Sequence, residues 1–122
     1  MTRALNGGQP DSTNHSRPPP KDNRAMKQVS LIGAPTDIGA GARGASMGPE
    51  AMRVAQIGPT LQAHGIEVFD RGNLLGPANP WQPPVDGFRH LPEVAAWNRA
   101  VHEAVHAELA LGHLPILLGG DH

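Results

Sequence analysis

The sequence has no cysteine, few aromatic residues, no excess of charge and no long apolar run. Without cysteine, the 122-residue chain can form neither disulfides nor thiolate metal sites. Aromatic residues make up only 3% of it, too few for the stacking platforms that bind single-stranded nucleic acid. The 10 Lys and Arg residues are balanced by 11 Asp and Glu residues. We therefore expect a cytoplasmic α/β protein without nucleic-acid or membrane partners.

The first 26 residues are polar and include Gly7-Gly8 and the run Pro18-Pro19-Pro20. A segment of this composition buries too little apolar surface to offset the entropy lost on ordering. Residues 1–26 are therefore predicted to be a disordered tail. Met26 directly precedes the first apolar run, and we interpret it as the natural start, with the residues before it outside the natural product.

From residue 27 onward, strand-like and helix-like apolar spacings alternate. The pattern predicts strands over 27–34, 66–70 and 115–118, two short helices between 48 and 64 broken at Gly58-Pro59, and a helix over 91–113. One side of that last helix is apolar, with residues at Val94, Trp97, Val101, Val105 and Leu109. The alternation indicates a parallel sheet with helices on its faces and right-handed crossovers.

Gly39-Ala40-Gly41-Ala42-Arg43-Gly44 matches the G-x-G-x-x-G pattern of dinucleotide-binding loops. In that fold the glycines directly follow a strand and open a helix, whose amides point at the phosphates. Here the strand ends near Ala34 and the helix begins only at Pro49. We favour a ligand-lining loop. A nucleotide-binding module, with Asp70 at the next strand end as its ribose-binding acid, is the alternative.

His102-Glu103-Ala104-Val105-His106 matches the zinc-protease pattern H-E-x-x-H on a helix. The extended form of that motif has Gly and His at the positions that Leu109 and Gly112 occupy in this sequence. The apolar stripe also puts both histidines on the solvated flank. We interpret them as surface residues, and we assign no role to His15, His64, His90 or His113.

The last eight residues, 115–122, read Pro-Ile-Leu-Leu-Gly-Gly-Asp-His. A short apolar strand is followed by two glycines that permit a sharp turn, and then by Asp121 and His122. Ligands of open α/β sheets bind outside the carboxyl ends of the strands, and imidazole is a common metal ligand. A single histidine at such a place is structural more often than it is a ligand, so both roles stay open on the pattern alone.

Three stretches in this order resemble the ureohydrolase family, and most closely its arginase branch. They are residues 29–53 (VSLIGAPTD, then GAGARGASMGPEAMR), residues 65–73 (GIEVFDRGN) and residues 117–122 (LLGGDH). The last matches the family's first metal-binding motif, and the likeness extends from residue 27 to residue 122. It implies the N-terminal part of a three-layer α/β/α parallel-sheet domain.

The resemblance also implies a chemistry. In this family the histidine of the Gly-Gly-Asp-His motif binds one of two manganese ions, so His122 is the implied metal ligand and Asp121 a motif residue. A hydroxide held between the metals attacks the guanidinium carbon, because two cations lower the pKa of the shared water. The implied reaction is the manganese-dependent hydrolysis of arginine to ornithine and urea. Agmatine or another guanidino compound is the alternative substrate.

In the family the remaining metal ligands and the proton-shuttling histidine lie after the position of His122, so no catalytic residue is assigned within residues 1–122. We therefore expect a shortened N-terminal portion, residues 27–122, that is inactive alone. The family is commonly trimeric or hexameric, which implies a homo-oligomer for the complete protein. A non-catalytic oligomerisation module is the remaining alternative.

Overall fold

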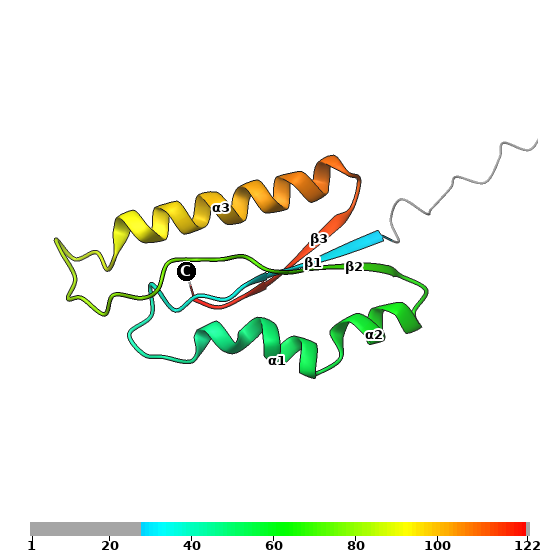
Figure 1. Ribbon diagram of the computed structural model, residues 1–122, viewed down its shortest axis with the longest axis horizontal. Coiled ribbons are helices and arrows are strands. Elements are labelled where there is room, and N and C mark those ends of the chain that lie inside the picture. Colours follow the sequence, from blue (N-terminus) through cyan, green and yellow to red (C-terminus); the bar gives the residue numbers. More distant parts are fainter. Residues whose placement is uncertain (1–27, 122) are drawn as a thin grey trace, which may run out of the picture.

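The computed structural model describes residues 28–121 (Figure 1). The predicted tail over residues 1–26 and the predicted metal ligand His122 lie outside the described residues. The elements follow in the order β1 (Gln28–Ala34), the 3-10 helix η2 (Ala45–Met47), α1 (Gly48–Val54), α2 (Ile57–Ala63), β2 (Glu67–Asn73), α3 (Leu91–Ala110) and β3 (Leu114–Gly119).

The three strands form one parallel sheet in the order β2-β1-β3. In the central strand β1, Leu31 pairs with Asp70 of β2 and with Ile116 of β3. All residues of β1 after Gln28 are buried. A strand covered on both faces favours an almost continuous apolar run, and the sequence of β1 has one.

Helices cover both faces of this sheet: α3 lies on one side, and α1 and α2 lie on the other (Figure 1). The core beside α2 centres on Val29, Leu31 and Leu118. Partly buried apolar residues pack against these three: Ile57, Leu61, Ile66, Val68 and Ile116. Each fully buried aliphatic side chain contributes about 1.5–3 kcal/mol. The arrangement confirms the predicted α/β fold with a parallel sheet between helical layers.

Trp97 of α3 is the largest fully buried side chain, with 2% of its surface exposed. Its ring lies against the backbone at Gly76, in the long loop before α3. A Cβ atom added to Gly76 would lie 2.4 Å from Cζ3 of Trp97, far inside van der Waals contact. Gly76 is therefore a glycine because the indole ring occupies the place of its side chain.

The boundary between α1 and α2 differs from the prediction. The break lies at Gln56, whose φ of 66° is left-handed, and not at Gly58-Pro59. Pro59 instead lies in the first turn of α2, where its missing N–H leaves no intrahelical bond unmade. Val54, the last residue of α1, is 79% exposed.

The ends of two further elements were predicted imperfectly. Strand β2 runs on to Asn73, which pairs with Gly33 of β1 after a register shift. Helix α3 ends at Ala110, and Gly112, with a φ of 79°, follows its last turn. At this end of α3 the buried residue is Glu108, whereas Leu109, predicted to face the core, is 55% exposed.

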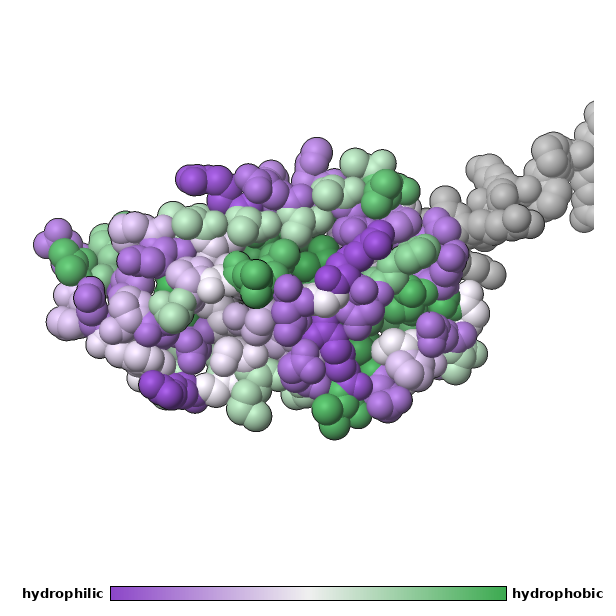
Figure 2. All heavy atoms as spheres, in the orientation of Figure 1, coloured by the Kyte–Doolittle hydropathy of each residue, from purple (hydrophilic) through white to green (hydrophobic). Residues whose placement is uncertain are grey.

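β2 and β3 are the outer strands of the described sheet. Leu114 and Leu117 of β3 are 57% and 44% exposed. On the face seen in Figure 2, apolar residues are visible between α3 and the α1–α2 layer. Among the described residues, none of the helices combines the length and the apolar character needed to cross a bilayer.

Candidate functional site

The carboxyl end of β3 is attached to the end of β1 by main-chain hydrogen bonds. The N–H of Gly120 donates to the carbonyl of Ala34 at 3.1 Å, and the N–H of Asp121 donates to the carbonyl of Thr36 at 2.9 Å. Asp121 itself is exposed. The Gly-Gly-Asp segment thus lies at the carboxyl edge of the sheet, where parallel α/β folds bind ligands.

Gly120 of this segment is required by close packing, and neither glycine is required, as predicted, by a sharp turn. Neither Gly119 nor Gly120 is among the glycines with positive φ. A Cβ atom at Gly120 would lie 2.2 Å from the carbonyl oxygen of Thr36 and 2.8 Å from that of Ala45. A Cβ atom at Gly48 would lie 2.2 Å from the carbonyl oxygen of Gly119. The start of α1 and the glycine-rich loop between β1 and α1 (residues 35–47) therefore pack directly on the backbone of this segment.

A small cavity of about 180 Å³ lies beside the same strand ends. Residues from the ends of β1 and β3 and from α3 line it: Ala34, Thr36, Leu117, Gly119, Gly120, Trp97, Asn98 and Val101. The strand-end backbone thus borders open space on the α3 side and the glycine-rich loop on the other.

No group of three or more potential metal-ligating side chains gathers within residues 28–121. The one predicted ligand, His122, follows Asp121 directly but lies outside the described residues. The described residues thus do not by themselves fit a manganese pair, and the metal role of His122 stays a prediction.

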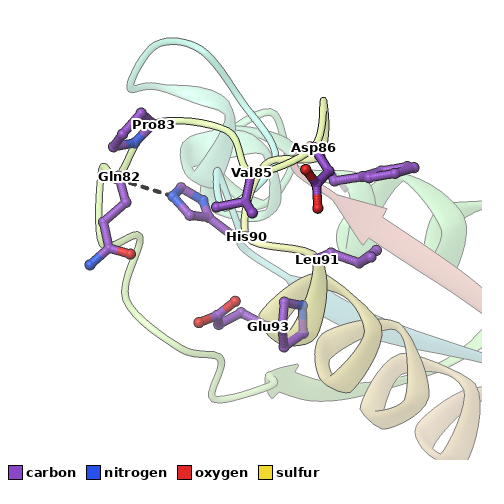
Figure 3. A pocket seen from close by; sticks show the side chains of 9 residues that line it. Gln82, Pro83, Val85, Asp86, His90, Leu91 and Glu93 are labelled. Atoms are coloured by element: carbon purple, nitrogen blue, oxygen red, sulfur yellow. Dashed lines mark hydrogen bonds between the residues drawn. The ribbon is translucent and has the colours of Figure 1, made fainter.

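The glycine-rich loop is attached to the loop before α3 by His90, to which the sequence analysis gave no role. His90 is 8% exposed. Its Nε2 accepts a hydrogen bond from the N–H of Gln82 at 3.1 Å (Figure 3). This leaves Nδ1 to donate to the carbonyl of Ile38 at 2.7 Å. Both ring nitrogens are therefore used in joining the two loops.

Asn79 makes a second attachment between these loops. Its Nδ2 donates to the carbonyl of Asp37 at 2.7 Å, and its Oδ1 accepts the N–H of Trp81 at 2.9 Å. The guanidinium of Arg43 lies over the Trp81 ring, 5.3 Å from its centroid. These side chains surround an open hollow of about 680 Å³, the Arg43 hollow, which is also lined by Gly44, Ser46, Met47 and Ala78.

A further cavity of about 550 Å³ lies at the start of α3 (Figure 3). Residues between Gln82 and Glu93 line it, with Val85, Phe88 and Leu91 as its large apolar members. None of its lining residues belongs to the strand ends or the glycine-rich loop. This cavity is therefore separate from the Gly-Gly-Asp segment.

Asp70, proposed as a ribose-binding acid in the nucleotide alternative, is held by Arg53 of α1. Nε and Nη2 of Arg53 each donate to Asp70 at 3.0 Å, while Nη1 donates to Glu50 and to Asn73. The hydrogen bonds from Arg53 lower the pKa of Asp70, and an N–H from Gly72 adds to this. η2 also separates Gly44 from α1. The G-x-G-x-x-G pattern thus lacks both a free acid and a directly following helix.

His102 and His106 are exposed on α3, as predicted. Their ring centroids lie 6.1 Å apart, and no third ligand lies with them among the described residues.

A cluster of polar side chains around the buried Glu108 was not predicted from the sequence. This Glu108 cluster is formed by Ser30, Arg71, Glu108 and His113, and the Arg71 side chain is 42% exposed. The Ser30 hydroxyl donates to Glu108, Nε of Arg71 donates to it at 2.7 Å, and Nδ1 of His113 lies 2.8 Å from it. Hydrogen bonds from Ser30, and then from Arg71 and His113, lower the pKa of Glu108 to about 2. The His113 ring also stacks on Phe69, with centroids 4.6 Å apart.

One signal in the sequence could have revealed this cluster. Glu108 follows Val101 by seven positions and Val105 by three, so it continues the apolar stripe of α3 on the face that points at the sheet. An acid at a core-facing position needs buried partners, since burying an unpaired carboxylate is costly.

Two of the curated relatives similar to this chain are bacterial arginases. The arginase of Brucella melitensis is 41% identical over 93 residues, which cover 75% of this chain and 30% of that protein. The arginase of Bacillus caldovelox is 37% identical over 99 residues, which cover 80% of this chain and 33% of that protein. The chain thus spans about a third of the length of these relatives.

Solved structures of arginases are also similar to this chain. The structure of Bacillus caldovelox arginase superposes with a TM-score of 0.70 at 37% identity and covers 79% of this chain and 33% of its own. A Bacillus subtilis arginase gives a TM-score of 0.69 at 32% identity, covering 79% and 31%. The sequence pattern of the Arginase family matches residues 27–122, which is most of the chain. The resemblance seen in the sequence is confirmed: the chain belongs to the arginase family.

Proposed function

We propose that the protein is a ureohydrolase that converts arginine to ornithine and urea with a pair of manganese ions. The observation that supports this most strongly is the family match over residues 27–122, which ends on the Gly-Gly-Asp-His motif. The relatives named above are arginases, which favours arginine over agmatine as the substrate.

In this proposal the described residues position the metal-binding motif. Gly48 and Gly120 let main chain contact main chain, so that His122 would follow a segment fixed by hydrogen bonds to the carbonyls of Ala34 and Thr36. When bound, a manganese pair would supply a hydroxide nucleophile at neutral pH. Oxygen ligands of the kind manganese prefers would have to join His122, because residues 28–121 gather no set of three ligands.

The test is urea release by the protein purified from its source, with L-arginine and with agmatine as substrates. We expect manganese-dependent activity on L-arginine that a chelator removes and added manganese restores. Preference for agmatine would replace arginine hydrolysis with agmatine hydrolysis. No urea from either substrate, at full manganese occupancy, would contradict the proposal.

Two companion proposals concern length and assembly. We propose that the 122-residue chain alone is inactive and binds manganese weakly, and that the active protein is a cytoplasmic trimer or hexamer. Intact mass and light scattering of the native protein, with cell fractionation, test these points. Tight stoichiometric manganese binding by the 122-residue chain in calorimetry would contradict the first of them.

A further inference from the structure

The exposed face of α3 carries two histidines one helical turn apart. His102 and His106 are both exposed, and their ring centroids lie 6.1 Å apart with the ring planes at 30° to each other. Zinc–nitrogen bonds of about 2.0–2.1 Å place the centroids of two imidazoles on one ion about 5–6 Å apart. The two rings therefore need only a small side-chain rotation to bind one ion together.

The ring nitrogens of this pair are not used within the protein. In contrast, Nδ1 of His64 contacts the carbonyl of Thr60, and His90 and His113 make their own hydrogen bonds. Within residues 28–121, no hydrogen bond of this kind involves His102 or His106. A neutral imidazole has one nitrogen with a free lone pair. Each ring of the pair thus offers a metal-binding nitrogen to solvent.

The helix that carries the pair is fixed on its opposite side. α3 is an outer layer on one face of the sheet (Figure 1). Trp97, five residues before His102, is 2% exposed, and Glu108, two residues after His106, is 7% exposed. Glu108 also accepts hydrogen bonds from side chains of β1 and β2. Residues four apart in a helix lie on one face, so the backbone already presents both rings to one ion.

The kind of ligand selects the kind of ion. Imidazole nitrogens suit Zn²⁺, Ni²⁺ and Cu²⁺, whereas Mn²⁺ prefers oxygen ligands and binds nitrogen sites more weakly. The exposed residues Arg99 and Glu103 each lie three positions before one of the histidines and have opposite charges. The local charge is therefore balanced, and we expect ligand chemistry to decide which ion binds.

We propose that His102 and His106 form a two-histidine binding site for a borderline divalent cation, Zn²⁺, Ni²⁺ or Cu²⁺, with water completing the coordination. Within residues 28–121 no third ligating side chain joins them. Catalytic zinc sites have three protein ligands, so this site binds an ion without the hydrolytic role of the H-E-x-x-H proteases. The inference does not rest on the proposed function, which uses neither residue.

NMR spectra of the isotope-labelled 122-residue chain test the site directly. Paramagnetic Cu²⁺ should broaden the backbone amide signals of residues 99–109 first. Dissociation constants are then read from the shifts that Zn²⁺ and Mn²⁺ cause in these same signals, so that binding elsewhere, including at His122, is not counted. We expect Zn²⁺ to bind at least about tenfold more tightly than Mn²⁺.

Substitutions on the helix surface separate chelation from binding to single histidines. His102→Ala and His106→Ala should each weaken Zn²⁺ at least about tenfold. The double variant His106→Gln, Ala107→His keeps two imidazoles on α3 but moves the second off the shared face, and it should bind as weakly as His106→Ala. His64→Gln, on the exposed end of α2, should change nothing. Circular dichroism shows whether each variant keeps its helices.

Four results would overturn the inference. They are the absence of Cu²⁺ broadening around α3, equal affinity for Zn²⁺ and Mn²⁺, full Zn²⁺ affinity in either alanine variant, and full affinity in the double variant with the relocated histidine. The last result would show that the two rings bind ions separately.

Discussion

The two ends of the parallel sheet are held together in different ways. Toward the amino end, side chains of the Glu108 cluster join β1, β2 and α3 through hydrogen bonds to the buried carboxylate of Glu108. At the carboxyl end, the contacts run between main-chain atoms, and glycines at positions 48 and 120 make room for them. The exposed side chain of Asp121 takes no part in these main-chain contacts.

The largest effect is expected from Gly120→Ala. The added Cβ atom would meet the carbonyl oxygens of Thr36 and Ala45, which are backbone atoms that cannot move aside separately. We expect the free energy of unfolding to fall by about 3 kcal/mol or more, measured by urea denaturation. Gly119→Ala is the matched control, because a Cβ atom there meets nothing within 4 Å. Equal losses in both variants would refute the close-packing explanation.

Glu108→Gln probes the opposite end of the sheet. The amide keeps the size of the side chain but loses the charge that Arg71 and Ser30 stabilise, so we expect a loss of about 2 kcal/mol in unfolding free energy. Glu103→Gln, on the exposed side of the same helix, should cost almost nothing. A Glu108→Gln variant as stable as the unsubstituted chain would show that the cluster contributes no net stability.

A smaller change should appear under mild acid. The folded-state pKa of Glu108 is about 2, below its ordinary value of 4.5. Its contribution to stability is thus complete above about pH 4.5 and is lost as the pH falls toward 2. Unfolding followed between pH 6 and pH 3 should show a steeper loss in the unsubstituted chain than in Glu108→Gln. Parallel profiles would mean that Glu108 has an ordinary pKa.

The smallest effect is expected for Arg53→Ala, which removes the ion pair with Asp70 between α1 and β2. This contact lies at the surface, where the Asp70 side chain is 44% exposed. The bidentate ion pair should therefore contribute only about 1 kcal/mol to the free energy of unfolding. Added salt should reduce this difference, as seen by denaturation at low and high ionic strength. Arg99→Ala serves as the control, and an equal loss there would remove any special role for Arg53.

The sequence was sufficient to predict those features of the fold that depend on local residue patterns. Apolar runs and helical spacing predicted the three strands, the long helix and the parallel arrangement. Three stretches in order, residues 29–53, 65–73 and 117–122, indicated the family. The Glu108 cluster was not predicted, because Ser30 is 78 residues from Glu108 and Arg71 is 37 residues from it. Only the folded sheet brings these polar residues together. Similarly, Asn73 became part of β2 through pairing with Gly33, not through its own strand preference.

The contact between Gly76 and Trp97 has a consequence for the history of the family. Because the indole ring fills the volume that a side chain at position 76 would need, the two positions cannot vary independently. A relative with a smaller residue in place of Trp97 would have room for alanine or serine at the position of Gly76, whereas a relative that keeps the tryptophan must keep the glycine. We therefore expect these two positions, 21 residues apart in the sequence, to change together among relatives.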